Sequence, residues 1–153
     1  MKALATPEPR SALLDLASEA MGRPRILLAE DDEELRLVLT EVLEEAGYEV
    51  ELAEDGRELL RRLAESFVSG EGVDLVLSDV RMPGMTGLDA LEALRDEDWV
   101  TPVLFMTAFG DAATHEEARR LGAWVLDKPF DVDELVDIVT GIVPPARYDQ
   151  GWR

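Results

Sequence analysis

The chain has 153 residues and a mass of 17.0 kDa, which is enough to bury one hydrophobic core but hardly two. Its 34 acidic and 15 basic side chains leave a net charge of −19, and such a surface repels nucleic-acid phosphates and anionic lipid head groups. The absence of cysteine excludes disulfides, zinc–thiolate sites and cysteine nucleophiles. Since no apolar run approaches a membrane span or a signal peptide, we expect a cytoplasmic protein that binds neither nucleic acid nor membrane.

Residues 1–24 precede the main body as an N-terminal extension with a short amphipathic helix. Ser11 is a suitable helix cap, the apolar residues after it recur at helical spacing, and Gly22 and Pro24 end the pattern. We expect this extension to be loosely docked or frayed, with binding of a specific partner as the alternative. Residues 144–153 contain two prolines and no helical periodicity, so we expect a short C-terminal tail.

Brief apolar runs alternate with longer amphipathic segments through residues 25–143, which we expect to form one domain. In chain order the pattern predicts a strand at 26–29, a helix at 33–46, a strand at 48–53, a helix at 57–67, a strand at 73–77, a helix from the turn at 82–87 to about 95, a strand at 103–106, a helix at 112–121, a strand at 124–126 and a helix at 132–143. Each predicted strand is therefore followed by a helix.

Five strands that alternate with five helices predict a doubly wound α/β domain, in which helices cover both faces of a parallel sheet. The runs that begin at 26, 73 and 103 are apolar almost throughout, as in strands at the centre of such a sheet. The run at 48–53 alternates apolar with acidic residues, which an edge strand tolerates. The strand order 2-1-3-4-5 fits this distribution.

Polar side chains follow the predicted strands, at the edge where the carboxyl ends of parallel strands meet. They are Glu30, Asp31 and Asp32 after the first strand, Ser78 and Asp79 after the third, Thr107 after the fourth, and Asp127 and Lys128 after the fifth. Carboxylates gathered at one edge repel one another, so they need protons or, more economically, a divalent cation. Ligands that are all oxygen suit Mg²⁺ or Mn²⁺. We expect Lys128 to point at an anion brought by that cation, most naturally a phosphoryl group.

Four short segments occur at the strand ends in a fixed order. They are ILLAEDD at 26–32 with Arg36 downstream, LVLSDVRMPGMTG at 75–87, VLFMTA at 103–108 and DKPF at 127–130. Together they resemble the receiver domain of two-component response regulators, in its stand-alone, chemotaxis-regulator-like form, over residues 25 to about 143. The resemblance implies a flavodoxin-like sheet of the order already expected.

The resemblance implies that Asp79 accepts a phosphoryl group from a phosphohistidine on a sensor histidine kinase or a histidine phosphotransfer protein. Lys128 would neutralise the phosphoryl charge, Thr107 would hydrogen-bond a phosphoryl oxygen, and the Lys128–Pro129 bond would be cis. The domain would then signal by conformational change to an unknown downstream protein, as a monomer or a phosphorylation-dependent dimer.

The resemblance also implies that Glu30, Asp31, Asp79 and the backbone carbonyl of Arg81 hold Mg²⁺. From the residues alone, Asp31 and Asp79 are the first choices as direct ligands, with Glu30 direct or through water. The acidic residues that follow, from Asp32 to Glu34, are interpreted as a solvated helix start, where carboxylates favour the positive end of the helix dipole.

The chain departs from the family pattern near the fifth strand. Val125 stands where the family usually has an aromatic side chain that reports phosphorylation, so Trp124 or the helix at 112–121 is our hypothesis for the reporter. Arg81 and Phe109 flank the site and are candidates to tune the lifetime of the acyl phosphate. His115 lies among glutamates and is interpreted as an exposed histidine rather than a catalytic base.

Two other functions compete with a phosphoaccepting signalling domain that phosphorylates and dephosphorylates itself without being an enzyme. An aspartyl-phosphate hydrolase of the haloacid dehalogenase type needs a second aspartate two residues after the nucleophile, and Arg81 stands there. An interaction module that is never phosphorylated is favoured in related proteins when the acceptor or the lysine is missing, whereas Asp79 and Lys128 are both present here.

Overall fold

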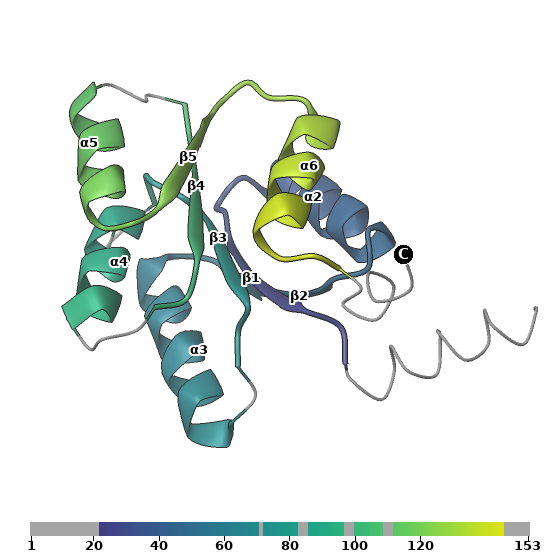
Figure 1. Ribbon diagram of the computed structural model, residues 1–153, viewed down its shortest axis with the longest axis horizontal. Helices are drawn as coiled ribbons and strands as arrows, with labels where there is room; N and C mark the ends of the chain where they lie inside the picture. The colour runs from purple at the N-terminus through teal and green to yellow at the C-terminus, as the bar shows by residue number, and fades with distance from the viewer. Residues whose placement is uncertain (1–21, 71, 83–85, 97–99, 109–111, 146–153) are drawn as a thin grey trace, which may run out of the picture.

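The computed structural model describes residues 22–70, 72–82, 86–96, 100–108 and 112–145 (Figure 1). Along these residues, strands and helices alternate as the sequence predicts. The elements are β1 (Arg25–Ala29), α2 (Glu33–Glu45), β2 (Glu49–Ala53), α3 (Gly56–Ser69), β3 (Leu75–Asp79), α4 (Gly87–Asp96), β4 (Val103–Thr107), α5 (Ala112–Arg120), β5 (Trp124–Asp127) and α6 (Val132–Ile142).

The five strands form one parallel sheet in the order β2-β1-β3-β4-β5, as predicted. The three apolar strands β1, β3 and β4 lie in the middle of the sheet, where both faces are covered. The alternating strand β2 and the short strand β5 form the two edges. The pattern of apolar and acidic residues therefore assigned the central strands and the β2 edge correctly.

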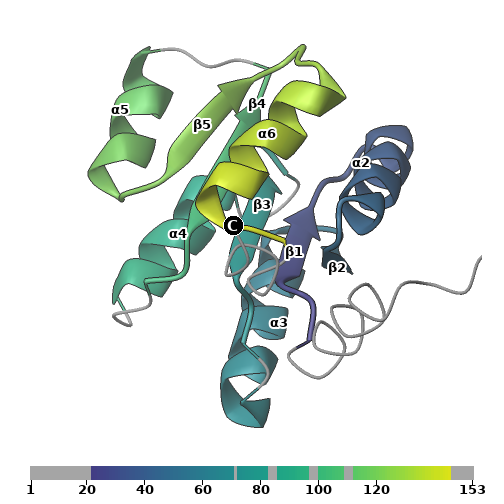
Figure 2. The ribbon, with the colours of Figure 1, turned by 45° about the vertical axis from the view of Figure 1, so that its right-hand side comes forward.

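Helices cover both faces of the sheet, with α3, α4 and α5 on one side and α2 and α6 on the other (Figures 1 and 2). Each layer buries its own apolar cluster. Leu59 and Leu63 of α3 belong to the first, and Leu39 of α2 and Leu135 of α6 belong to the second. Each fully buried leucine contributes about 2 kcal/mol, so the helices of both layers stabilise the central strands.

Three strands end later than the apolar runs predict. The predicted strands at 73–77, 103–106 and 124–126 are in fact Leu75–Asp79, Val103–Thr107 and Trp124–Asp127, so Asp79, Thr107 and Asp127 are the last strand residues rather than loop residues. The reason is the pairing of neighbouring strands, which aligns Asp79 with Met106 and Thr107 with Asp127. Side chains at strand positions are held more firmly than side chains in a loop, which favours a preorganised site.

The start of α2 has the form expected from its acidic residues. The Asp32 side chain caps the helix by accepting a hydrogen bond from the Leu35 backbone N–H at 3.2 Å, and Glu33 and Glu34 in the first turn are exposed. The Lys128–Pro129 bond is cis, as the resemblance implies.

Several expectations fall outside the described residues. They concern the helix in residues 1–21, Phe109 and the tail at 146–153. Among the helices that the structure does describe, none is long and apolar enough to span a bilayer.

Candidate functional site

Three of the predicted carboxylates meet at the carboxyl edge of the sheet. Glu30 and Asp31 follow β1, and Asp79 ends the neighbouring strand β3, whose Ser78 is aligned with Ala29. One oxygen from each of the three carboxylates lies within 4.8 Å of the others. Residues that are 48 or more positions apart in the chain are thus brought together by the register of two parallel strands. We call this group the acid cluster.

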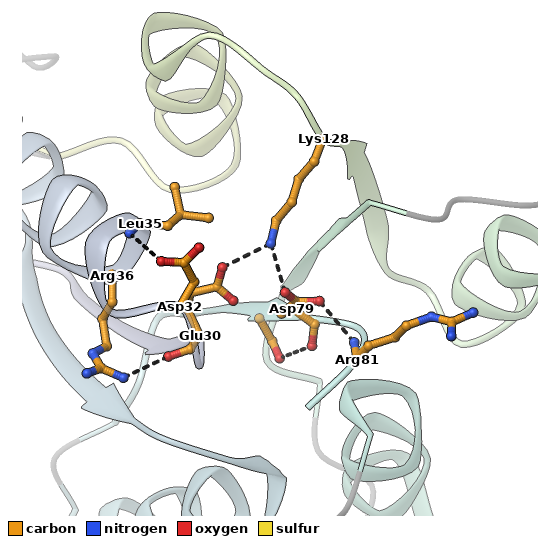
Figure 3. A network of polar contacts seen from close by, with 8 residues as sticks. Glu30, Asp32, Leu35, Arg36, Asp79, Arg81 and Lys128 are labelled. Atoms are coloured by element: carbon orange, nitrogen blue, oxygen red, sulfur yellow. Dashed lines mark hydrogen bonds and ion pairs between the residues drawn. The ribbon is translucent and has the colours of Figure 1, made fainter. Parts of the chain in front are cut away.

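Lys128 follows the last residue of the edge strand β5, and its side chain extends from there to the acid cluster (Figure 3). Its ammonium donates to Glu30 Oε1 at 2.9 Å and to Asp79 Oδ2 at 2.8 Å. Its backbone N–H donates to the Thr107 carbonyl at 2.7 Å, which extends the pairing of β5 with β4 by one residue. The ammonium therefore bonds to the carboxylates themselves, because two nearby negative charges attract it strongly. That Lys128 points at an anion brought by a bound cation stays a prediction.

Glu30 is fully buried, and one of its oxygens lacks a hydrogen bond. Oε1 accepts from Lys128, but Oε2 is buried without a hydrogen-bond partner among the described residues. Burial and the neighbouring Asp79 carboxylate raise the pKa of Glu30 to about 7, although Lys128 opposes this shift. A buried oxygen without a partner is costly, and a bound cation would satisfy it. The donor set, three carboxylates with no sulfur or imidazole, fits a hard divalent cation.

Lys128 remains charged in this setting. Burial works against its charge, but the bonds to Asp79 and Glu30 outweigh burial and raise the pKa of the ammonium. The site therefore combines a positive charge on Lys128 with one buried carboxyl group, Glu30, whose pKa is raised.

The Asp79 carboxylate is held at both oxygens. Oδ2 accepts from Lys128, and Oδ1 accepts from the Arg81 backbone N–H at 2.9 Å. The Arg81 side chain extends away from the acid cluster (Figure 3). The Asp79 residue is only 9% exposed, and its carbonyl accepts from the Ser78 hydroxyl at 2.9 Å. These contacts fix the orientation of a carboxylate that still reaches the surface.

Thr107 ends the strand next to Asp79 and is almost fully buried, with 1% of its surface exposed. Its carbonyl oxygen accepts the hydrogen bond from the Lys128 backbone N–H, and the residue aligned with it on β5 is Asp127. The structure thus places every predicted site residue at one edge of the sheet: Glu30, Asp31, Asp79, Arg81, Thr107 and Lys128.

Sequence reasoning gave no role to two residues that shape the site. Arg36 of α2 donates from Nη1 to the Glu30 carbonyl at 3.0 Å, which ties the end of β1 to the helix (Figure 3). Gly87 begins α4 so close to β3 that an added Cβ would lie 2.6 Å from the Asp79 carbonyl oxygen. Both belong to the quoted segments, but nothing in their local sequence indicates these contacts.

His115 is less exposed than the sequence predicts. Its side chain is 31% exposed, and Nε2 lies 2.9 Å from Asp127 Oδ1. The contact joins residues twelve positions apart on α5 and β5, a pairing that glutamate neighbours along the helix do not reveal.

Comparisons with known proteins agree with this geometry. The family model of the response regulator receiver domain matches residues 26–140. Regulatory protein AtoC of Escherichia coli is 40% identical over 116 residues, 75% of this chain but 24% of AtoC. Sporulation initiation phosphotransferase F of Bacillus subtilis is 35% identical over 125 residues, 81% of this chain and 97% of that protein.

Solved structures show the same likeness. Chemotaxis protein CheY4 of Vibrio cholerae has a TM-score of 0.71 and 31% identity, covering 80% of this chain and 100% of that chain. The receiver domain of HemR from Leptospira biflexa has a TM-score of 0.69 and 35% identity, covering 81% of this chain and 97% of that chain. The chain thus spans nearly the full length of some relatives and about a quarter of others. It belongs to the receiver domain family of two-component response regulators, whose members are signalling phosphoacceptor domains.

Proposed function

We propose that Asp79 is the phosphoacceptor of this receiver domain and takes its phosphoryl group from a phosphohistidine on a sensor histidine kinase or a histidine phosphotransfer protein. The observation that carries the proposal is the position of the Asp79 carboxylate, 2.8 Å from the Lys128 ammonium and inside the acid cluster. Phosphoryl transfer to a carboxylate brings two negatively charged groups together, so positive charge must offset their repulsion. Around Asp79 the Lys128 ammonium supplies one positive charge, and the carboxylates of the acid cluster are ligands for a divalent cation that would supply more.

In the proposed step, a carboxylate oxygen of Asp79 forms a bond to phosphorus as the phosphorus–nitrogen bond of the phosphohistidine breaks. The electron pair of that bond stays on the imidazole nitrogen, and the histidine leaves as neutral imidazole because its other ring nitrogen carries a proton in the reacting phosphohistidine. We also propose that the phosphoryl group is lost to water without an enzyme partner: a water oxygen bonds to phosphorus as the bond to the Asp79 oxygen breaks, which releases inorganic phosphate and a proton and restores the carboxylate.

The other residues of the site have supporting roles in the proposal. Lys128 would turn from the carboxylates to a phosphoryl oxygen, and the Thr107 hydroxyl would donate to another. Glu30, Asp31, Asp79 and the Arg81 backbone carbonyl would hold Mg²⁺, with Mn²⁺ as a substitute. The bound cation would neutralise the phosphoryl oxygens as the carboxylate approaches.

We propose that residues 25–143 form the receiver domain, with 1–24 as an extension and 144–153 as a tail. Its output would be a changed surface read by a downstream protein, as a monomer or a phosphorylation-dependent dimer. The family match to residues 26–140 supports these limits, and the −19 net charge supports a protein partner over a nucleic acid.

Intact-mass spectrometry after incubation with Mg²⁺ and a small phosphodonor, such as acetyl phosphate, tests the proposal. The parent chain should gain one phosphoryl group, and Asp79→Asn should gain none. Asp137→Asn is the matched control, because Asp137 is an exposed aspartate on α6 away from the acid cluster. If Asp79→Asn takes up as much phosphoryl as the parent, Asp79 is not the acceptor.

A further inference from the structure

A second polar contact lies beside the acid cluster without belonging to it. The His115 ring on α5 donates from Nε2 to Asp127 Oδ1 at 2.9 Å, and Asp127 is the last residue of β5. Asp127 immediately precedes Lys128 and is aligned with Thr107 across the sheet. The contact therefore joins a helix to the chain segment from which Lys128 reaches Asp79.

This segment is paired with a strand on one side alone. β5 is four residues long and forms an edge of the sheet, so β4 is its only neighbour among the described strands, while Val125 and Leu126 pack in the two apolar clusters. The Lys128 backbone N–H holds it to the Thr107 carbonyl, and the His115–Asp127 contact holds it to α5. A displacement of Lys128 or of Thr107 therefore acts directly on Asp127, through the adjacent peptide or through the aligned strand.

Geometry matters more than charge in this contact. The Asp127 side chain is 58% exposed and that of His115 is 31% exposed, so solvent screens much of any charge between them. A directional hydrogen bond remains, and such a bond changes a local equilibrium by about two- to tenfold.

We infer that His115 and Asp127 are positioning residues that couple Lys128 to α5. The inference rests on the proposed function: when a phosphoryl group on Asp79 draws Lys128 and Thr107 toward it, Asp127 moves with them, and the hydrogen bond to His115 passes the movement to α5. The helix at residues 112–120 then presents a different surface in the phosphorylated form.

Amide hydrogen exchange of residues 112–120, measured on the full chain with Mg²⁺ before and after addition of beryllofluoride, tests the coupling. The variants are His115→Ala, which removes the donor, and His115→Gln, whose amide nitrogen reaches the same place as Nε2. Alanine is a good helix former, so α5 should persist in the first variant. Glu117→Gln is the matched control, because the Glu117–Arg120 ion pair lies within α5 and does not reach β5.

The parent and Glu117→Gln should show the same exchange change in α5, His115→Ala should reduce this change by about two- to tenfold, and His115→Gln should restore most of it. A full response in His115→Ala, or no recovery in His115→Gln, overturns the inference. So does a parent that takes up a phosphoryl group by intact mass while α5 exchange stays constant. A parent that takes up no phosphoryl group instead overturns the proposed function.

Discussion

The Lys128 ammonium lies 2.9 Å from Glu30 Oε1, although 98 residues separate the two in the chain. The same ammonium bonds Asp79, so one positive charge serves two carboxylates of which one is fully buried. Burying a carboxylate is costly unless it is paired or protonated, and here a single lysine must balance the site within the folded chain. We therefore expect the ionisation of Glu30 to affect the free energy of unfolding, and the loss of Lys128 to affect both the free energy of unfolding and the rate of phosphoryl uptake.

Replacement of Glu30 by glutamine should remove a pH dependence from the free energy of unfolding. Burial raises the pKa of Glu30 from 4.5 to about 7, so between these values the folded chain keeps a proton that the unfolded chain has lost. The contribution of Glu30 to the free energy of unfolding is fully present below about pH 4.5 and is lost as the pH rises through about 7. The whole contribution is on the order of 3 kcal/mol.

Urea unfolding at pH 5 and pH 8, with a chelator present, measures this effect. Between pH 5 and pH 8, the free energy of unfolding should fall more in the parent than in Glu30→Gln. Glu44→Gln, at an exposed position on α2, should behave as the parent does. Equal losses in the parent and Glu30→Gln would show that Glu30 is ionised to the same degree in the folded and unfolded chains.

Replacement of Lys128 by methionine should lower the rate of phosphoryl uptake by at least about tenfold, because a charge that offsets the incoming oxygens is lost. It should also destabilise the chain by about 2 kcal/mol at pH 8, because two charged hydrogen bonds are removed. At pH 5 the loss should be smaller, since Glu30 is then protonated.

Time-resolved intact mass and urea unfolding give the two readouts for Lys128→Met. The control is Arg61→Met, since Arg61 is exposed on α3 and pairs only with Glu65 among the described side chains. Uptake at the parent rate in Lys128→Met would remove the lysine from the proposed chemistry.

Replacement of Gly87 by alanine should destabilise the chain by about 2 kcal/mol and lower phosphoryl uptake. The added Cβ would lie 2.6 Å from the Asp79 carbonyl oxygen and 2.8 Å from the Phe105 ring, so α4 and β3 must separate. This separation would shift the backbone that carries the phosphoacceptor.

Gly141→Ala is the matched control for Gly87→Ala. Gly141 lies in α6 with open space at the Cβ position, so alanine there should raise stability by up to about 1 kcal/mol. Thermal unfolding compares the two variants, and unchanged stability in Gly87→Ala would mean that α4 adjusts at no cost.

Much of the fold could be predicted because it depends on local patterns. Apolar runs and helical spacing predicted all five strands and all five helices of residues 25–143 and the central place of β1, β3 and β4. The ends of elements were less certain, because strand pairing extended β3 and β4 to include Asp79 and Thr107. Whether a polar residue joins a strand depends on its neighbour in the sheet, which the local sequence does not contain.

The sequence by itself determined which side chains follow which strands, and hence that Glu30, Asp79 and Lys128 share one edge, because parallel strands end together. Only the tertiary structure decided how they meet. It placed the ammonium on the carboxylates, left a Glu30 oxygen without a hydrogen bond, and joined His115 to Asp127. The physical reason is that a hydrogen bond depends on the direction of the side chain and on the register of distant segments to within an ångström or less. Periodicity along the chain reports only which face or edge of an element a residue occupies.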